Sequence, residues 1–270
     1  MNQELREMVP WAECNEYHSP PRRRRPAVYR VPGIGDLWFF ARLIGKVVWP
    51  ARRYAVTHGY DYRRLVEDSL QTLRLIEAAG SQVHFSGFEH VRALADRPAV
   101  FVGNHMSTLD TFLTPAMITP FNRIVFVAKE ALTKGFFGPI HNALDPVTVG
   151  REDPRADLKA VLAQGAERLR EGRSVVLFPQ RTRAVEFDPD TFNSLGAKLA
   201  QRNGVPLVPF ALKTDFYLPG KLVREVGRVR PERDVRAAFG PGIETADGKE
   251  AHRQCLAFIS ACFERWAVKK

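Results

Sequence analysis

The fold of this chain is organised around one stretch of sequence, Val100-Phe101-Val102-Gly103-Asn104-His105-Met106-Ser107-Thr108-Leu109-Asp110. Its first part is short, apolar and rich in β-forming residues, which indicates a buried strand over 99–103. Ser107 or Thr108 can cap the helix that follows. The chain is therefore expected to turn at His105.

His105 and Asp110 can meet only if one of them lies outside the helix. Two side chains five residues apart on one helix point about 140° away from each other. If His105 lies in the turn, the Asp110 carboxylate can reach back and accept the Nδ1 proton, which leaves Nε2 free to take a proton from a hydroxyl. This arrangement is the histidine–carboxylate half of a hydrolase triad. The alternative is a histidine that only satisfies local backbone groups.

The rest of the chain alternates strand and helix patterns. Strands are predicted at 83–86, 99–103, 124–128, 174–178, 207–212 and 235–239, with a short one ending before Gly150, and helices at 62–79, 88–95, 109–117, 154–171, 192–202 and 250–268. This alternation favours an α/β fold: a single domain with a mixed, largely parallel central sheet flanked by helices. Active sites in such sheets collect at the carboxyl ends of strands, where His105, Arg151 and the 181–183 segment are predicted to lie.

Four short motifs follow one another between about residues 84 and 215. They are Asn104-His105 with Asp110, the segment 146–151 that ends in Arg151, Phe178-Pro179-Gln180-Arg181-Thr182-Arg183, and Val205-Pro206-Leu207-Val208-Pro209. In this order they resemble the motifs N-H-x4-D, a strand ending in Arg, F-P-E-G-T-R and V-P-x-V-P of the glycerolipid acyltransferase family, which includes 1-acylglycerol-3-phosphate acyltransferases.

The resemblance implies that an acyl group moves from acyl-CoA or acyl carrier protein to the free hydroxyl of a lysophospholipid such as 1-acylglycerol-3-phosphate. His105 would be the general base and Asp110 its orienting carboxylate. The donor is a co-substrate with an already activated thioester, so neither a cofactor nor a metal is expected. The histidines of the chain also lack metal-ligand spacing.

Arg151 and Arg183 match family positions that hold the acceptor phosphate, and a guanidinium suits bidentate binding of phosphate. Surface salt bridges are the alternative. Lys129, at the end of the 124–128 strand, would add to the same positive field. The full set of expected substrate contacts is Asn104, Lys129, Arg151, Gln180, Arg181, Thr182 and Arg183.

The third motif departs from the family at two positions. Gln180 replaces the usual Glu and Arg181 replaces the usual Gly. Gln180 can still exchange hydrogen bonds with a glycerol hydroxyl, but it carries no charge and cannot act as a base. Arg181 also makes the loop bulkier and more cationic. The chemistry is expected to be kept, while the acceptor headgroup stays open between 1-acylglycerol-3-phosphate and another anionic lysolipid, and loss of activity is the alternative.

Net charge points to an anionic partner. The formal charge is +10 and the pI is near 9.8, which suits a membrane surface, a phosphorylated substrate, an acidic carrier or nucleic acid. The three cysteines form no C-x-x-C pair, which favours a reducing cytosol, and no cleaved signal peptide is expected at the N-terminus.

The N-terminal part, residues 1–60, is predicted to be a basic arm followed by an amphipathic membrane-associating helix, with the acyltransferase domain at 61–270. Residues 1–30 carry Arg22–Arg25 and are expected to have little regular structure. The apolar run 37–49 is shorter than the roughly 20 residues needed to cross a bilayer. A helix here would instead lie in the interface through a face made of Phe40, Leu43, Ile44, Val47 and Val48.

This helix predicts peripheral or monotopic attachment to the cytoplasmic side of an anionic membrane, and packing of the helix onto the domain is the alternative. Two other functions remain open from the sequence. One is a non-catalytic basic module that binds an anionic membrane or nucleic acid, although nucleic acid is not the expected partner. The other is a thioesterase or hydrolase on the same scaffold.

Overall fold

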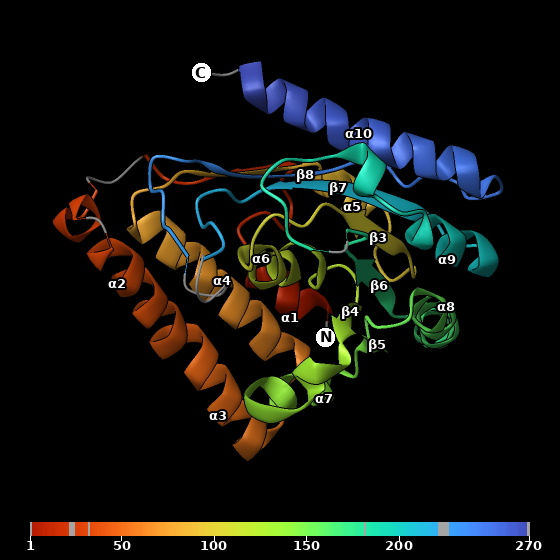
Figure 1. Cartoon of the computed structure of the whole chain (residues 1–270), viewed down its shortest axis with the longest axis horizontal. Helices are drawn as coiled ribbons and strands as arrows, with labels where there is room; N and C mark the ends of the chain where they lie inside the picture. Colours follow the sequence, from red (N-terminus) through yellow and green to blue (C-terminus); the bar gives the residue numbers. More distant parts are fainter. Residues whose placement is uncertain (1, 22–24, 32, 181, 221–226, 269–270) are drawn as a thin grey trace.

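An eight-stranded sheet separates two layers of helices (Figure 1). The computed structural model describes residues 2–21, 25–31, 33–180, 182–220 and 227–268. The strand order is β1-β2-β8-β7-β3-β6-β4-β5. The strands are β1 (Glu16–His18), β2 (Val83–Ser86), β3 (Val100–Gly103), β4 (Ile124–Lys129), β5 (Val147–Val149), β6 (Ser174–Leu177), β7 (Leu207–Lys213) and β8 (Val235–Phe239).

The sheet is mixed and largely parallel, as predicted. β7, β3, β6, β4 and β5 run in one direction. β8 is antiparallel to β7, β2 is parallel to β8, and β1 is antiparallel to β2. The carboxyl ends of β3, β4, β5 and β6 therefore lie along one edge, which is where the sequence places its candidate functional residues.

Helices cover both faces of the sheet. They are α1 (Asn2–Glu7), α2 (Ile34–Leu43), α3 (Trp49–His58), α4 (Tyr62–Ala78), α5 (Phe88–Arg92), α6 (Leu109–Ile118), α7 (Gly138–Leu144), α8 (Pro154–Arg170), α9 (Leu195–Asn203) and α10 (Gly248–Val268). In Figure 1, α8, α9 and α10 lie on one side of the sheet, and α1, α2, α4 and α6 lie on the other.

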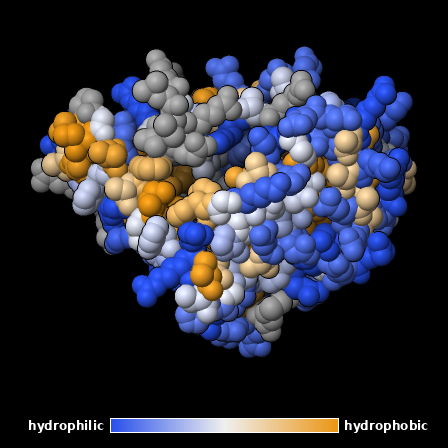
Figure 2. Space-filling view, turned by 60° about the horizontal axis from the view of Figure 1, so that its bottom comes forward, coloured by the Kyte–Doolittle hydropathy of each residue, from blue (hydrophilic) through white to orange (hydrophobic). Residues whose placement is uncertain are grey.

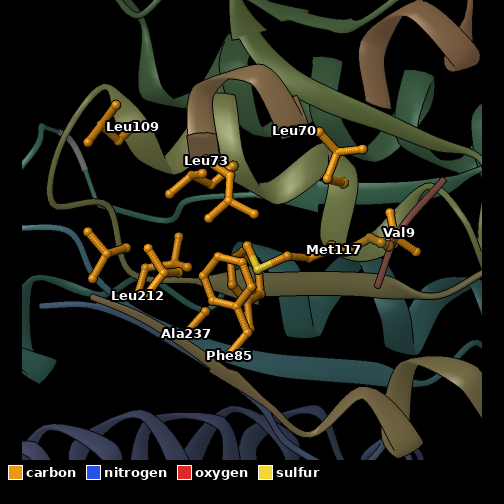
Figure 3. Close-up of a cluster of buried hydrophobic side chains, with 14 of the residues drawn as sticks. Val9, Leu70, Leu73, Phe85, Leu109, Met117, Leu212 and Ala237 are labelled. Carbon is orange, nitrogen blue, oxygen red and sulfur yellow. The ribbon is translucent and has the colours of Figure 1, made fainter. Parts of the chain in front are cut away.

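Two hydrophobic cores result from this layering. Within β7, Val208 and Leu212 face the first core, whereas Leu207 and Ala211 face the second. A strand buried on both faces is apolar throughout instead of alternating, because each side chain meets a helix layer. Figure 3 shows the first core, where side chains of α4, α6, β2, β7 and β8 meet.

The expectation of little regular structure in the N-terminal arm is wrong for residues 2–7 and 16–18, which form a helix and a strand. Trp11 is fully buried, and Leu5 and Val9 belong to the first core. Residues 16–18 form β1, the edge strand of the sheet. This segment is thus part of the α/β domain. Its few large apolar side chains pack into the first core, and their spacing in the sequence does not predict this packing. Arg22–Arg24 lie outside the described residues.

The apolar run 37–49 is helical, but its orientation differs from the prediction. α2 and α3 are joined by a π-helical turn over Ile44–Val48. Leu43, Val47 and Val48 of the predicted membrane face are buried against the domain together with Phe39. The run is apolar around most of its circumference, so the sequence could not tell which side the domain would cover.

Candidate active site

The turn after β3 holds the candidate active site. β3 ends at Gly103, beside the ring of Phe210 on β7. A Cβ atom at residue 103 would lie 2.5 Å from two carbons of that ring, which is closer than van der Waals contact allows. Glycine therefore lets β3 and β7 stay paired up to the point where the chain turns toward His105.

Asn104 fastens this turn to the neighbouring strand. Its amide nitrogen donates to the carbonyl of Leu212, and its amide oxygen accepts from the Leu212 N–H, both at 2.8 Å. The side chain is buried. Both ends of the amide bind the backbone of β7, which gives Asn104 a structural role, and its contact with substrate stays a prediction.

His105 and Asp110 meet as the sequence predicted. Nδ1 of His105 lies 2.8 Å from Oδ2 of Asp110, and α6 presents this carboxylate from its first turn. The same oxygen accepts the backbone N–H groups of Met106 at 2.6 Å and Ser107 at 2.9 Å. Because an ionised carboxylate only accepts, the hydrogen-bond network assigns the proton to Nδ1.

The remaining ring nitrogen, Nε2, has no hydrogen-bond partner among the described residues. The His105 side chain is 17% exposed, whereas that of Asp110 is fully buried. Phe178, directly after β6, stacks on the imidazole with ring centroids 4.6 Å apart and planes 18° apart. The local sequence pattern does not predict this contact, since it does not show that two strand ends bring these rings together.

Gln180 holds the turn from the other side. Its Oε1 accepts the backbone N–H of His105 at 2.5 Å, and the side chain is buried. The Ala184 N–H donates to the His105 carbonyl at 2.9 Å, so the loop after β6 clamps both backbone groups of the histidine. The predicted partner of Gln180 is a glycerol hydroxyl, whereas in the structure its carbonyl oxygen accepts the His105 backbone N–H.

This contact predicts how Gln180 variants behave. Gln180→Leu is expected to lower the free energy of unfolding by about 1–3 kcal/mol, because the His105 N–H would be buried without a partner. Gln180→Glu keeps an acceptor at the same position and is expected to keep the fold. Urea unfolding of both variants checks this, and equal midpoints for the leucine and glutamate variants would contradict the assignment.

Cationic side chains lie along the same edge. Arg183 donates a hydrogen bond from Nη1 to Oγ1 of Thr108, the residue that precedes α6, which brings its guanidinium next to the His105 turn. Thr182 is exposed beside it. Arg181 lies outside the described residues.

Arg151 and Lys129 lie farther along the edge. β5 is three strands from β3 in the sheet, so at about 4.8 Å per strand the backbone that leads to Arg151 leaves the sheet about 14 Å from the end of β3. Lys129, the last residue of β4, is exposed between them. The structure thus brings Arg183 to the histidine, while Arg151 and Lys129 extend the positive edge away from it.

The backbone of Arg151 has an uncommon conformation. Its φ is +67°, a left-handed value that non-glycine residues seldom adopt. The Arg151 N–H donates to both carboxylate oxygens of Asp157 at 3.1 Å, and the Gly150 N–H donates to Oδ1 at 3.0 Å. The first turn of α8 therefore fixes the end of β5, and strained positions of this kind cluster at functional sites.

One more residue joins the site without having been predicted. Thr214, just beyond β7, donates a hydrogen bond from Oγ1 to Oδ1 of Asp110 at 2.5 Å. It lies 104 residues from Asp110, and a threonine after a strand carries no signal of such a role. The described part of the chain contains no cluster of three or more His, Cys, Asp or Glu side chains arranged to hold a metal.

Comparisons with known proteins identify acyltransferases as the relatives of this chain. A family model described as Acyltransferase matches residues 82–213. A 1-acyl-sn-glycerol-3-phosphate acyltransferase of Pseudomonas aeruginosa is 28% identical over 188 residues, which are 70% of this chain and 68% of that protein. One from Chlamydomonas reinhardtii is 31% identical over 157 residues, 56% of this chain and 45% of its own length.

The fold also has a solved counterpart. The crystal structure of the 1-acyl-sn-glycerophosphate acyltransferase PlsC from Thermotoga maritima superimposes with a TM-score of 0.64 at 20% identity, covering 88% of this chain and 96% of that one. At this identity the likeness concerns the fold, and it spans nearly all of the architecture in Figure 1.

Proposed function

Because the chain belongs to the glycerolipid acyltransferase family, we propose that it moves a fatty acyl group from acyl-CoA or acyl carrier protein to the free hydroxyl of a lysophospholipid such as 1-acylglycerol-3-phosphate. The observation that carries this proposal is the 2.8 Å contact between His105 Nδ1 and the fully buried Asp110 carboxylate. It fixes the tautomer in which Nε2 is unprotonated and can accept a proton.

The proposed reaction uses this geometry directly. Nε2 of His105 takes the proton of the acceptor hydroxyl while the hydroxyl oxygen attacks the thioester carbon. Asp110 stabilises the imidazolium that forms through Nδ1–H. The tetrahedral intermediate then expels the donor sulfur, which takes the proton back from Nε2. The products are an ester and a free thiol, and the imidazole returns to its starting state.

Arg183 supplies the anion-binding part of the proposal. Its guanidinium is held at the start of α6 by Thr108, close to the base, so it suits a phosphate attached to the glycerol that carries the reacting hydroxyl. Arg151 and Lys129 lie farther away and would act on charged groups of the acceptor headgroup or of the donor. Gln180 would contribute by holding the His105 turn.

An acceptor panel tests the function. Purified protein is incubated with acyl-CoA or acyl-loaded carrier protein and a set of anionic and zwitterionic lysophospholipids, and both free thiol and diacyl product are measured. Thiol release that requires a lysophospholipid supports the proposal. Thiol release without acceptor would indicate a thioesterase, and tight salt-sensitive RNA binding without turnover would indicate a binding module.

A membrane-facing surface is the second part of the proposal. Among the described residues, no helix is long and apolar enough to cross a bilayer. Large hydrophobic side chains are nevertheless exposed along α2 and α3 and beside α7, with Leu37 at 63%, Trp38 at 48% and Trp49 at 58% exposure. We call this set the apolar belt: Val31, Ile34, Leu37, Trp38, Trp49, Val56, Leu132 and Phe136.

Figure 2 shows hydrophobic surface gathered at the end of the molecule where α2 lies. Cations border the apolar belt: the Arg42 guanidinium lies 5.9 Å from the centroid of Trp38, and that of Arg52 lies 4.8 Å from Phe136. Aromatic, aliphatic and basic residues on one surface suit the boundary between acyl chains and anionic headgroups. We therefore place this surface against the cytoplasmic leaflet, as a peripheral or monotopic contact.

The double variant Leu37→Ser/Trp38→Ser is expected to weaken binding to anionic vesicles by about 100-fold or more, because each side chain buried in the interface contributes about 1.5–3 kcal/mol. Both residues are exposed, so thermal unfolding should hardly change. Vesicle co-sedimentation measures the binding, with Leu37→Ile/Trp38→Phe as the matched variant that keeps apolar area. Equal binding by the serine and conservative variants would exclude this surface.

A further inference from the structure

A pair of buried hydroxyl groups lies behind the catalytic carboxylate. Ser107 Oγ donates to Thr214 Oγ1 at 2.8 Å, and Thr214 Oγ1 donates to Asp110 Oδ1 at 2.5 Å. Thr214 and Asp110 are fully buried, and Ser107 is nearly so. Buried polar groups of this kind are almost always hydrogen-bonded, and these bonds supply their partners within the chain.

The two oxygens of Asp110 have separate partners. Oδ2 receives His105 Nδ1 and two backbone N–H groups, whereas Thr214 Oγ1 is the donor to Oδ1. An ionised carboxylate cannot donate and a threonine hydroxyl has one hydrogen. Thr214 must therefore point its hydrogen at Asp110 and accept from Ser107, so the direction of every bond in the chain is fixed.

The support for this arrangement comes from β7. The Leu212 backbone holds Asn104 on both sides of its amide, and the Thr214 N–H donates to Met106 Sδ at 3.2 Å. The end of β7 is thus bound to the turn that carries His105 at two further points. A carboxylate anchored through Oδ1 to this rigid strand cannot rotate away from the imidazole without breaking the Thr214 bond.

We propose that Thr214 is a positioning residue for the acyl transfer: its hydroxyl orients the Asp110 carboxylate so that Oδ2 faces Nδ1 of His105. This inference rests on the proposed function. Thr214 is buried behind Asp110 and does not reach the substrate, so its effect is expected on turnover and not on substrate binding.

The test compares variants of nearly equal volume. Thr214→Val removes the donor and is expected to lower kcat by about 10-fold or more with KM changed less than about 2-fold, because the Asp110 carboxylate loses the charge-assisted hydrogen bond that orients it. Thr214→Ser restores the hydroxyl and is expected to recover kcat to within about 3-fold of the original, as the bond to the charged group is remade. Rescue by serine separates the hydroxyl from the packing of the methyl group.

Thr119→Val is the matched control. Thr119 is also fully buried, at the end of α6, but its hydroxyl has no hydrogen-bond partner among the described residues. The substitution is expected to leave kcat unchanged and the melting temperature equal or higher, since it removes a polar group buried without a partner.

A second readout needs no turnover. The Nδ1 proton of His105 should give a low-field proton resonance that disappears in His105→Ala, moves or broadens in Thr214→Val, and is kept in Thr214→Ser. If Thr214→Val does not fold, Thr214→Cys, a weaker donor, replaces it and should turn over more slowly than Thr214→Ser.

The outcomes separate the two proposals. A parent protein that is silent with every donor and acceptor contradicts the proposed function, while the resonance still decides the role of Thr214. A parent protein that is active, together with a folded Thr214→Val variant of equal kcat and unchanged resonance, overturns the positioning role. So does a change confined to KM, or a folded serine variant that fails to recover kcat.

Discussion

His105→Ala is expected to lower the rate of acyl transfer by about 10²–10⁴-fold, the usual contribution of a general base. The base is lost outright, because Nε2 is the ring nitrogen available to the acceptor while Nδ1 is bound to Asp110. The measurement is diacyl product formed under single-turnover conditions with saturating donor, so that product release does not mask the chemical step.

His90→Ala is the matched control for this variant. His90 lies on α5, away from the carboxyl edge of the sheet, and its removal should leave the rate unchanged. Circular dichroism must show that His105→Ala is folded, since the Phe178 ring loses its stacking partner. A folded His105→Ala protein that turns over at the original rate would remove His105 from the reaction.

Asp110→Asn is expected to have the second largest effect, and on two properties at once. An amide offers one acceptor oxygen, whereas Asp110 accepts four hydrogen bonds through two oxygens. The rate should fall by about 10²–10⁴-fold because the histidine tautomer is no longer fixed. The free energy of unfolding should fall by about 1.5–3 kcal/mol, which corresponds to about 2–4 °C per kcal/mol in a chain of this size.

Asp61→Asn provides the comparison. Asp61 caps α4 by accepting the Arg64 N–H at 2.8 Å, and asparagine caps a helix equally well. That variant is expected to melt with the parent protein and to turn over normally. If Asp110→Asn also melted with the parent protein, the four hydrogen bonds would not be supporting the turn.

The candidate site shows where local patterns are sufficient. The histidine, the aspartate and the edge on which they lie follow from an apolar run, a spacing of five and the rule that parallel strands end together. Each of these depends only on residues close in sequence or on the common direction of the strands. The contact between His105 and Asp110 was predicted for this reason, and the structure confirms it.

The supporting residues could not be found in this way. Phe178 and Thr214 reach the site because β6 and β7 flank β3. Asn104 and Gln180 were assigned to substrate from their motif positions, yet their amides bind the backbone of Leu212 and His105. Amide groups suit either role, so only the position of the neighbouring backbone decides between them.

The N-terminal segment shows the same division. The sequence by itself determined that 37–49 is an apolar helix too short to cross a bilayer, because length and composition are local properties. Only the tertiary structure decided that Phe39, Leu43 and Val47 face the domain while Leu37 and Trp38 face outward, and that Trp11 enters the core. Which side chains become buried depends on contacts between segments that are distant in sequence. The hydrophobic effect is non-directional, so an apolar helix or loop does not by itself specify what it packs against.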